Sequence, residues 1–423
     1  MILKKKLLEN IISYLIVIIP IALITGPFIS DLIIFIINII FLLYCFIKND
    51  LKIFKNIYFK YFLIFYFICI ISALLSDYKS ISLVKSIFYI RFAVFSLAFY
   101  TILKIKKKLP EYLFISFMLC FSLLIFDGIY QYIFDVNIVG YKIQEYYRVS
   151  SFFKDELIYG SYLSRLQPIL FALFFVVNFS NRKFLKFYFF LLMVLTCISI
   201  MISGERASFA FLIMTSTYLM LMLKINTKYL MASFLTVLLT IILFISFNST
   251  VKYRLIDFTS EQVGLTAGDL TFFSKEHTGH YFAAIDIFKS NKIIGIGPKN
   301  FRNYCYNNKK YSIKPFICSS HPHNTYIQLL TETGIAGFIT IFIIFLLITY
   351  FSIKHLYGKI INKVYYFNNH EICLIAAMLI SVWPLITTGS FFNNYLNIIY
   401  FFPIGIFLSS KYKQNLPTKF FEK

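Results

Sequence analysis

Long runs of apolar residues, separated by short polar turns, recur along almost the whole chain. A helix needs about 20 mostly apolar residues to cross the hydrocarbon core of a bilayer. This pattern predicts an all-α polytopic integral membrane protein with about twelve transmembrane helices. The expected spans cover residues 10–26, 28–47, 57–75, 81–103, 111–134, 159–178, 187–203, 206–224, 229–247, 325–353, 372–389 and 395–410.

Two connections between the expected spans are much longer than the others, at residues 135–158 and 248–324. Loops beyond about 15 residues are uncommon unless they carry a function. The longer loop contains an amphipathic segment from Gly279 to Lys289, which predicts a short helix, and then the turn Gly295-Ile-Gly-Pro298. The chain therefore divides into nine spans in 1–247, the large loop 248–324, three spans in 325–410 and a tail at 411–423.

The formal net charge of +22 is carried by lysines and arginines that gather at alternate ends of the expected spans. Short cytoplasmic loops of membrane proteins carry an excess of these residues, so both termini are expected in the cytoplasm and both long loops on the opposite side of the membrane. The basic excess is then a topology signal, and no nucleic-acid partner is expected. The apolar start, residues 1–26, is expected to remain as a span because no small-residue cleavage site follows it.

Five of the seven cysteines lie in or beside apolar spans, where cysteine behaves as a small hydrophobic residue. Cys305 and Cys318 are different, because both lie in the polar part of the large loop. Oxidising compartments favour disulfides. A Cys305–Cys318 bridge is therefore predicted, and the alternative is a pair of free thiols.

The segment His321-Pro322-His323-Asn324 follows the longest polar stretch and opens a long apolar run. Histidine is the usual general base near neutral pH, which makes His323 the candidate catalytic residue. The alternative is that Asn324 caps the helix and that His321 and His323 only mark the interface. Two histidines without a clear third ligand make a poor metal site, so no metal is expected. Glu332, about two turns further on, is a candidate to orient the base or to line a polar pocket.

Arg206 lies in the short turn Ser203-Gly-Glu-Arg-Ala-Ser208, on the same side as the large loop in this topology. A guanidinium at this depth is costly unless it meets an anion. Glu205 is one available partner, and a phosphate held by both guanidinium nitrogens is the other. Eight further basic residues are weaker candidates, and for each the alternative is a solvated or ion-paired side chain. They are Lys85, Arg91 and Arg165 in spans, Arg148 in the first long loop, and Arg254, His277, His280 and Arg302 in the second.

The sequence has no P-loop, dinucleotide fingerprint or Gly-x-Ser-x-Gly elbow. An enzyme of this kind would therefore use a substrate that is already activated and attached to a lipid, without a cofactor.

Several short motifs resemble those of the O-antigen ligase and polymerase family of bacterial envelope glycosyltransferases. The most specific is His323-Asn324 followed, after nine residues that include Glu332, by Gly334-Ile-Ala-Gly337. The others are Gly295-Ile-Gly-Pro298 with Asn300-Phe301, the turn at Arg206, and Tyr147-Arg148 with Ser151-Phe152. Their order and the single large loop ahead of the histidine helix also match the family plan.

The resemblance implies transfer of a glycan from a polyprenyl diphosphate carrier to an acceptor hydroxyl at the periplasmic face of the inner membrane. It gives His323 the catalytic role and Arg206 the role of the first essential periplasmic arginine. The family often has an arginine where this chain has Thr278-Gly279-His280, so His280, Arg302 or Arg254 is expected to supply the second contact. The expected substrate-binding residues are completed by Arg148, His321, Asn324 and Glu332, with Arg91 and Arg165 as deeper contacts of the carrier.

The resemblance leaves the acceptor open. A ligase would use a lipid A–core sugar, a polymerase would use a growing glycan, and transfer to a protein is a third variant of the same chemistry. A transporter or flippase would predict internal repeats and broken helices in matching halves, which the sequence does not show.

Overall fold

The computed structural model describes residues 2–144, 148–177, 182–263, 273–313 and 317–413. Tyr147 of the first-loop motif and most of the expected tail 411–423 lie outside this part of the chain. Within the described residues the regular structure is helical, and the only β contacts are two isolated antiparallel bridges. The all-helical class expected from the apolar pattern is therefore confirmed.

The elements are α1 (Ile2–Thr25), α2 (Pro27–Lys48), η1 (Lys52–Lys55), α3 (Ile57–Leu74), α4 (Lys79–Ile87), α5 (Ile90–Ile105), α6 (Leu109–Phe134), η3 (Ser151–Phe153), α7 (Tyr159–Phe174), α8 (Lys183–Ile202), α9 (Arg206–Met222), α10 (Thr227–Phe247), α11 (Ser249–Lys252), η4 (Tyr253–Asp257), α12 (Phe258–Gln262), α13 (Lys275–Ser290), α14 (Phe301–Asn307), α15 (Lys309–Ser312), α16 (Thr325–Tyr357), η5 (Gly358–Asn362), α17 (Asn369–Ser381) and α18 (Asn394–Lys413).

Eight helical segments among the described residues are long and apolar enough to cross a membrane. One of them, Lys79–Ile105, combines α4 and α5. Every expected span falls on a helix, but α9, α17 and α18 provide shorter apolar segments, and α7 has only 16 residues. The protein is therefore a multi-span helical membrane protein, and the count of about twelve spans stays a prediction.

One expected span is wrong in its extent. The sequence predicts a helix over 372–389, but α17 ends at Ser381 and residues 382–393 form a non-helical loop. Pro384 lacks the backbone N–H that a continuing helix needs, and it disfavours the helical conformation of the residue before it. The polar run Thr387-Thr388-Gly389-Ser390 therefore forms a loop instead of a membrane-spanning helix.

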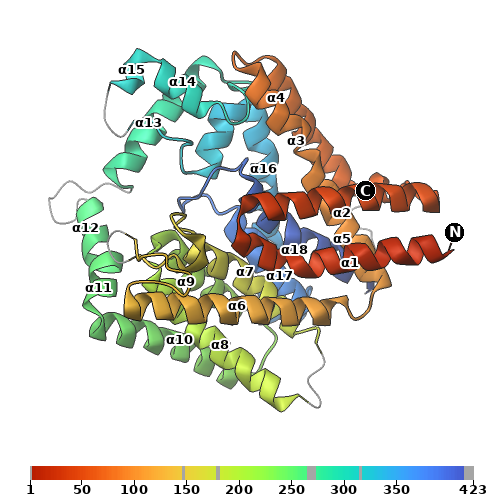
Figure 1. The fold of residues 1–423 in the computed structure, drawn as a ribbon, viewed down its shortest axis with the longest axis vertical. Coiled ribbons are helices and arrows are strands. Elements are labelled where there is room, and N and C mark those ends of the chain that lie inside the picture. Colours follow the sequence, from red (N-terminus) through yellow and green to blue (C-terminus); the bar gives the residue numbers. More distant parts are fainter. Residues whose placement is uncertain (1, 145–147, 178–181, 264–272, 314–316, 414–423) are drawn as a thin grey trace.

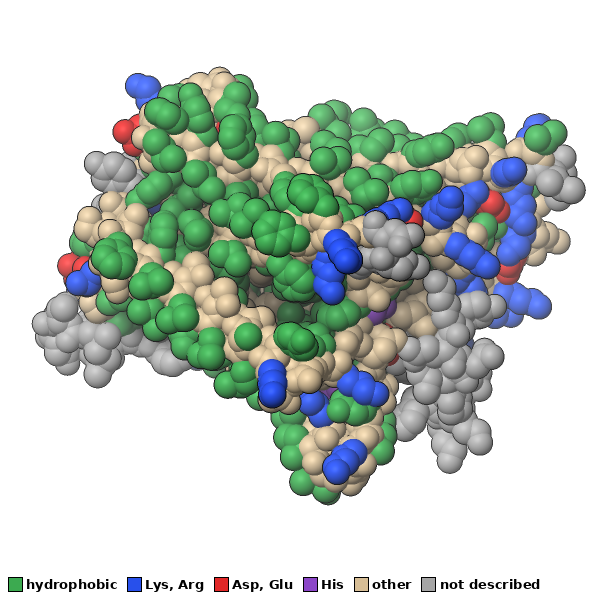
Figure 2. Space-filling model, turned by 90° about the horizontal axis from the view of Figure 1, so that it is seen from below, with side chains coloured by type: hydrophobic (Ala, Val, Ile, Leu, Met, Phe, Trp, Pro, Cys, Tyr) green, Lys and Arg blue, Asp and Glu red, His purple; other side chains and the backbone are tan. Residues whose placement is uncertain are grey.

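The helices are arranged so that the large loop packs over one end of the bundle (Figure 1). In that view α13, α14 and α15 lie together near the start of α16, beside the hairpin of α3 and α4, and α7, α9 and α17 lie near the centre. Hydrophobic side chains cover much of the face in Figure 2, whereas lysines and arginines gather mainly at its right-hand edge. Such segregation is typical of a protein surrounded by lipid.

A break in α16 joins the large loop to the bundle. Gly334 has a φ of 65° and interrupts the helix. The carbonyl groups released there accept hydrogen bonds from the turn of the large loop: Ile296 N–H donates to Thr331 O (3.0 Å) and Gly297 N–H to Glu332 O (2.9 Å). A Cβ on Gly295 would lie 2.6 Å from the backbone nitrogen of Gly334, so close backbone contact explains why both motifs contain glycine.

A disulfide joins Cys305 of α14 to Cys318, and their Cα atoms are 5.6 Å apart. It ties the segment that precedes the histidine motif to α14. The other five cysteines are buried free thiols.

Candidate functional site

The backbone at His323 has an unusual conformation directly before the N-cap of α16. His323 has a φ of 59°, in the left-handed region that a non-glycine residue seldom adopts. Asn324 is the N-cap of α16, and its side-chain oxygen accepts hydrogen bonds from the N–H groups of Tyr326 (3.0 Å) and Ile327 (3.1 Å). The backbone N–H of Thr388 donates to His323 O (2.9 Å). The capping role considered for Asn324 is therefore present alongside the histidine.

Four histidines form a cluster around this position. His277 and His280 lie one turn apart on α13, which begins at Lys275 rather than at Gly279 as the sequence suggested. The ring centroid of His323 is 5.4 Å from that of His277, 5.4 Å from that of His280 and 4.0 Å from that of His321. The cluster joins the large loop to the start of α16.

Within the cluster, His323 is the member whose ring has no hydrogen bond to a described residue. His321 uses both ring nitrogens, Nδ1 with Ser320 Oγ (2.8 Å) and Nε2 as a donor to Thr388 O (3.3 Å). His280 Nδ1 donates to Ile317 O (3.1 Å), and His277 Nδ1 contacts Ser274 Oγ (2.5 Å). The His323 imidazole is thus available to a substrate.

Burial keeps the two motif histidines neutral. It lowers the pKa of His323 to about 4, with further lowering from the charges of His277 and His280. Burial also lowers the pKa of His321 to about 3, assisted by the charges of His323 and Lys299. Both imidazoles are therefore unprotonated near neutral pH, the state that a general base requires.

Glu205 is not the ion-pair partner of Arg206. Its carboxylate points onto the first turn of α7 and accepts hydrogen bonds from Gly160 N–H (2.7 Å), Ser161 N–H (3.0 Å) and Ser208 Oγ–H (2.8 Å). Burial raises the pKa of Glu205 to about 7. Among the described residues Arg206 has no carboxylate within ion-pair distance.

Three arginines gather around Gly204 instead. A Cβ placed on Gly204 would lie 3.3 Å from Arg148 Cγ and 3.2 Å from Arg254 Cγ. The guanidinium carbons of Arg206 and Arg254 lie 5.8 Å and 4.8 Å from the ring centroid of Phe258. Arg148 Nε is buried without a hydrogen-bond partner among the described residues. This arginine cluster (Arg148, Arg206 and Arg254) places three cationic groups next to a short turn, and the charges of Glu205 and Glu276 act on Arg148 and Arg206 respectively.

The arginine cluster and the histidine cluster adjoin through His277. The positive charge of Arg206 is among the causes that lower the pKa of His277. The ring of His277 lies 5.4 Å from the ring of His323. His277 thus lies beside His323 and within range of the charge of Arg206, so it connects the two residues that the sequence singled out.

Other expected site residues lie elsewhere or have other partners. Glu332 is fully buried, and its carboxylate accepts from Phe301 N–H (3.2 Å) and Gln328 Nε2–H (2.9 Å). It therefore fixes the turn of the large loop and does not contact His323. Arg302 is exposed on α14, where its charge acts on Lys299.

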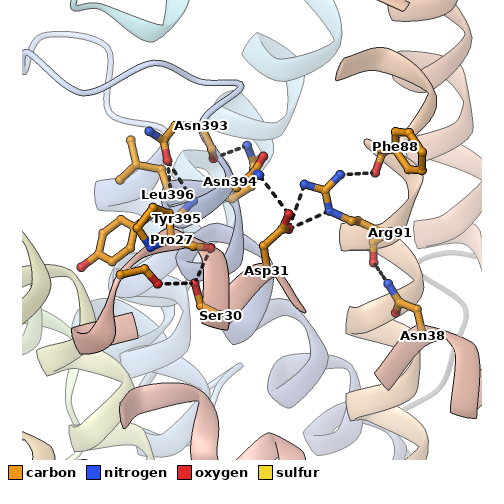
Figure 3. Close-up of polar contacts among 12 residues, drawn as sticks. Pro27, Ser30, Asp31, Asn38, Phe88, Arg91, Asn393, Asn394, Tyr395 and Leu396 are labelled. Carbon is orange, nitrogen blue, oxygen red and sulfur yellow. Dashed lines mark hydrogen bonds and ion pairs between the residues drawn. The ribbon is translucent and has the colours of Figure 1, made fainter. Parts of the chain in front are cut away.

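The two arginines expected to be deeper contacts differ from each other. Arg91 forms an ion pair with Asp31 (2.9 Å), shown in Figure 3. Arg165 is buried and donates from NH2 to Thr388 Oγ1 (3.0 Å) and from Nε to Ser161 Oγ (3.2 Å). Its NH1 has no hydrogen-bond partner in the part of the chain that the structure describes. Arg165 thus lies beneath the histidine motif, whereas Arg91 belongs to a separate site.

Sequence reasoning missed Thr388. The backbone N–H of Thr388 donates a hydrogen bond to the carbonyl oxygen of His323, and its own carbonyl oxygen accepts one from the ring of His321. Its hydroxyl oxygen accepts a hydrogen bond from Arg165. The polar run after Pro384, inside an expected span, was the available signal. The described residues contain no group of three or more His, Cys, Asp or Glu arranged to hold a metal ion.

The fold and the site define a class: a helical multi-span membrane protein with a histidine and arginine centre at one end of its bundle. Residues 191–342 match the model of the O-antigen ligase family. The matched segment contains Arg206, Arg254 and all four clustered histidines, and the match confirms the family resemblance. Comparison with curated proteins gives no match.

Proposed function

We propose that this protein is a membrane glycosyltransferase of the O-antigen ligase type. It moves a glycan from a polyprenyl diphosphate carrier to a hydroxyl of a lipid A–core acceptor at the periplasmic face of the bacterial inner membrane. The observation that carries the proposal is that the unbonded ring of His323 contacts His277, whose pKa is lowered in part by the charge of Arg206 from a cluster of three arginines.

The arginine cluster is the site proposed for the diphosphate of the donor. Guanidinium groups form paired hydrogen bonds with phosphate oxygens, and Arg206 has no competing carboxylate among the described residues. Fixed positive charge in a partly buried site stabilises the charge that develops on a departing diphosphate. Three guanidinium groups supply this charge without the need for a metal ion.

His323 is the proposed general base. The acceptor oxygen attacks the anomeric carbon while His323 takes its proton, and the bond from that carbon to the diphosphate oxygen breaks with its electron pair going to the diphosphate. Direct displacement inverts the anomeric centre. A bound dianion raises the basicity of a nearby imidazole, which offsets the low pKa of His323 in the free protein.

The second positive contact is assigned to Arg254, with Arg148 beside it. Arg254 lies against Gly204 and shares the ring of Phe258 with Arg206. Arg302 is exposed on another helix, and His280 packs against His323 rather than against the arginines. Of the three candidates weighed from the sequence, Arg254 therefore fits best.

The test is glycan transfer by the purified protein in proteoliposomes, with carrier-linked donor and lipopolysaccharide core as acceptor. Loss of a general base costs about 10²–10⁴-fold in rate, so His323→Ala should reduce transfer by that factor. His370→Gln is the matched control, since His370 lies at the opposite end of α17 from the Thr388 loop. Near-normal transfer by His323→Ala, at unchanged melting temperature, would remove His323 from this role.

Chromatography of lipopolysaccharide from a deletion strain separates the ligase from the polymerase of the same family. Loss of a ligase leaves bare core together with carrier-linked polymer. Loss of a polymerase leaves core with a single repeat unit, and loss of a transporter leaves the carrier-linked unit on the cytoplasmic side. Only the first outcome supports the ligase assignment.

A further inference from the structure

A groove separate from the histidine and arginine centre opens between α2, α4 and the start of α18. It encloses a cavity of about 330 Å³. Its walls are exposed apolar side chains: Phe28, Leu32 and Phe35 from α2, Val84 from α4, and Phe88 directly after α4. Its polar groups are Asp31, Arg91 and Asn394, drawn in Figure 3, together with Lys85. Apolar walls around a small polar floor are typical of a site for an amphipathic ligand.

The polar groups of this groove lie near the end of a span. Asp31 is four residues after Pro27, where α2 begins, which places it about 6 Å along the helix axis. Asn394 is the first residue of α18. Such a depth corresponds to the boundary between lipid head groups and acyl chains.

Charge in the groove is not balanced. Asp31 Oδ1 accepts from Arg91 Nε (2.9 Å), and its Oδ2 accepts from Asn394 Nδ2 (3.0 Å). Arg91 NH1 donates to Phe88 O (2.9 Å), and the Asp31–Arg91 pair is neutral overall. Lys85 has no carboxylate within ion-pair distance among the described residues. The groove therefore has a net charge of +1 beside apolar walls, which complements an anionic lipid head group.

The turn of the large loop that packs on α16 also packs on α4, the helix that carries Lys85. A Cβ on Gly297 would lie 2.7 Å from Ser82 Oγ, and Ser82 is one turn before Lys85. Lys299 belongs to this turn: burial lowers its pKa, the charge of Glu332 opposes that lowering, and the charges of Lys85 and Arg302 add to it. The charge of Lys299 is also among the causes that lower the pKa of His321. The turn therefore borders α4, with the groove, on one side and α16 on the other.

We propose that this groove binds the acceptor lipid, with Lys85 contacting a phosphate on its head group and its acyl chains lying against Phe28, Leu32, Phe35, Val84 and Phe88. The inference that this lipid is the acceptor depends on the proposed function. The inference that a phosphate-bearing lipid binds depends only on the shape and charge of the groove.

The arrangement around His323 favours the acceptor over the donor as occupant. The arginine cluster adjoins His277, whereas Lys299 acts on His321. The arginine cluster and Lys299 therefore act on different histidines of the cluster. Direct displacement at an anomeric carbon needs the incoming oxygen and the departing diphosphate on opposite sides. An acceptor site beside α4, apart from the arginine cluster proposed for the diphosphate, satisfies this requirement.

Binding is measured first, without donor, by native mass spectrometry of the purified full-length protein. The probe is dioleoyl phosphatidic acid, which has a phosphomonoester and two acyl chains. Phosphatidylcholine and inorganic phosphate are the comparison ligands. One lysine near a membrane surface is worth about 1 kcal/mol, so Lys85→Gln should weaken phosphatidic acid binding about fivefold, while Lys85→Arg should retain it. Lys79→Gln is the matched control, because Lys79 is an exposed lysine at the start of the same helix and outside the groove.

Asp31→Asn gives an opposite expectation. It removes the anion that neutralises Arg91, so phosphatidic acid binding should become several-fold tighter. Equal affinity in wild type, Lys85→Gln and Lys79→Gln would overturn the groove as a phosphate site. Equal affinity for phosphatidylcholine would do the same, and full competition by inorganic phosphate would show that no lipid is required.

The acceptor role is tested separately by transfer kinetics. Lys85→Gln should raise the KM for the acceptor about fivefold and leave the KM for the donor unchanged. A change in the donor KM alone would overturn the assignment to the acceptor. Absence of transfer by the wild-type protein would refute the proposed function, but the binding result would still decide the groove.

Discussion

Arg91 and Arg206 both lie near the end of a bundle helix, next to or near a carboxylate, yet their surroundings differ. Arg91 pairs with Asp31 at 2.9 Å and donates a further hydrogen bond to Phe88 O. Arg206 adjoins Glu205 in the sequence, but that carboxylate accepts its hydrogen bonds from Gly160, Ser161 and Ser208. Arg91 has a carboxylate within ion-pair distance, whereas Arg206 has none among the described residues and only the more distant charge of Glu276 acts on it.

The difference shows how to separate a structural cation from a binding cation in a membrane protein. An ion pair that meets its own hydrogen-bonding needs lowers the cost of placing charge near lipid, and it leaves nothing for a ligand. An arginine whose neighbouring carboxylate is used to cap another helix keeps its charge for an external anion. The adjacent positions of Glu205 and Arg206 in the sequence therefore suggest an ion pair, whereas in the structure the Glu205 carboxylate contacts other residues.

The largest expected effect comes from removing the free arginine. Arg206→Ala should reduce glycan transfer about 10²–10³-fold, because one preorganised group that stabilises developing negative charge contributes on this scale. Arg206→Lys should recover only part of the rate, since an ammonium group lacks the paired geometry. Initial rates in proteoliposomes measure both.

Arg302→Ala is the control for this prediction, because Arg302 is exposed on α14 away from the arginine cluster. Its transfer rate should stay within about threefold of wild type, an exposed-surface effect. Wild-type rates in Arg206→Lys would show that paired contact with phosphate is not needed.

Much of this architecture could be predicted from apolar periodicity. The helical class, the amphipathic helix in the large loop and the histidine at the start of α16 all follow from runs of apolar residues and the positions of polar ones. These features are local, because each depends on a contiguous stretch of sequence.

The partners of individual side chains could not be predicted in the same way. The contacts of Glu205 with Gly160 span 45 residues, and those of Thr388 with His321 span 67. The spacing of apolar residues along the sequence does not predict such contacts, because they depend on how separate helices pack against each other. The cluster of His277 and His280 with His323 was hidden for the same reason, although i and i+3 spacing on a helix indicates a shared face.

A smaller effect is expected from the paired arginine, and it should concern stability. Arg91→Gln leaves Asp31 without its cation, and this pair is partly exposed, so the free energy of unfolding should fall by about 1–2 kcal/mol. Asp31→Asn combined with Arg91→Gln should recover part of this loss. Denaturant titration of the four proteins in the cycle measures the coupling, and a coupling of zero would contradict the comparison drawn between the two arginines.

A still smaller effect is expected for Glu205→Gln. The amide can replace only part of the carboxylate's contacts with Gly160 and Ser161, which resembles the loss of a helix cap and costs about 1 kcal/mol in stability. Transfer by the folded variant should remain within about threefold of wild type. A loss of transfer as large as that of Arg206→Ala would instead indicate that Glu205 and Arg206 act as an ion pair.

The smallest effect near neutral pH is expected from the titration of His323. A base acts in its unprotonated form, and burial lowers the pKa of this imidazole to about 4. The value of kcat/KM for the donor, which reports the free protein, should therefore stay level as the pH falls from 7 to 5 and should decline only as it passes through about 4. The acidic decline in kcat should occur at a higher pH than the decline in kcat/KM, because a diphosphate held by the arginine cluster favours the protonated His323 ring. Coincident limbs in kcat and kcat/KM would mean that the diphosphate does not sit close enough to His323 to affect its charge, which would break the link between the two clusters.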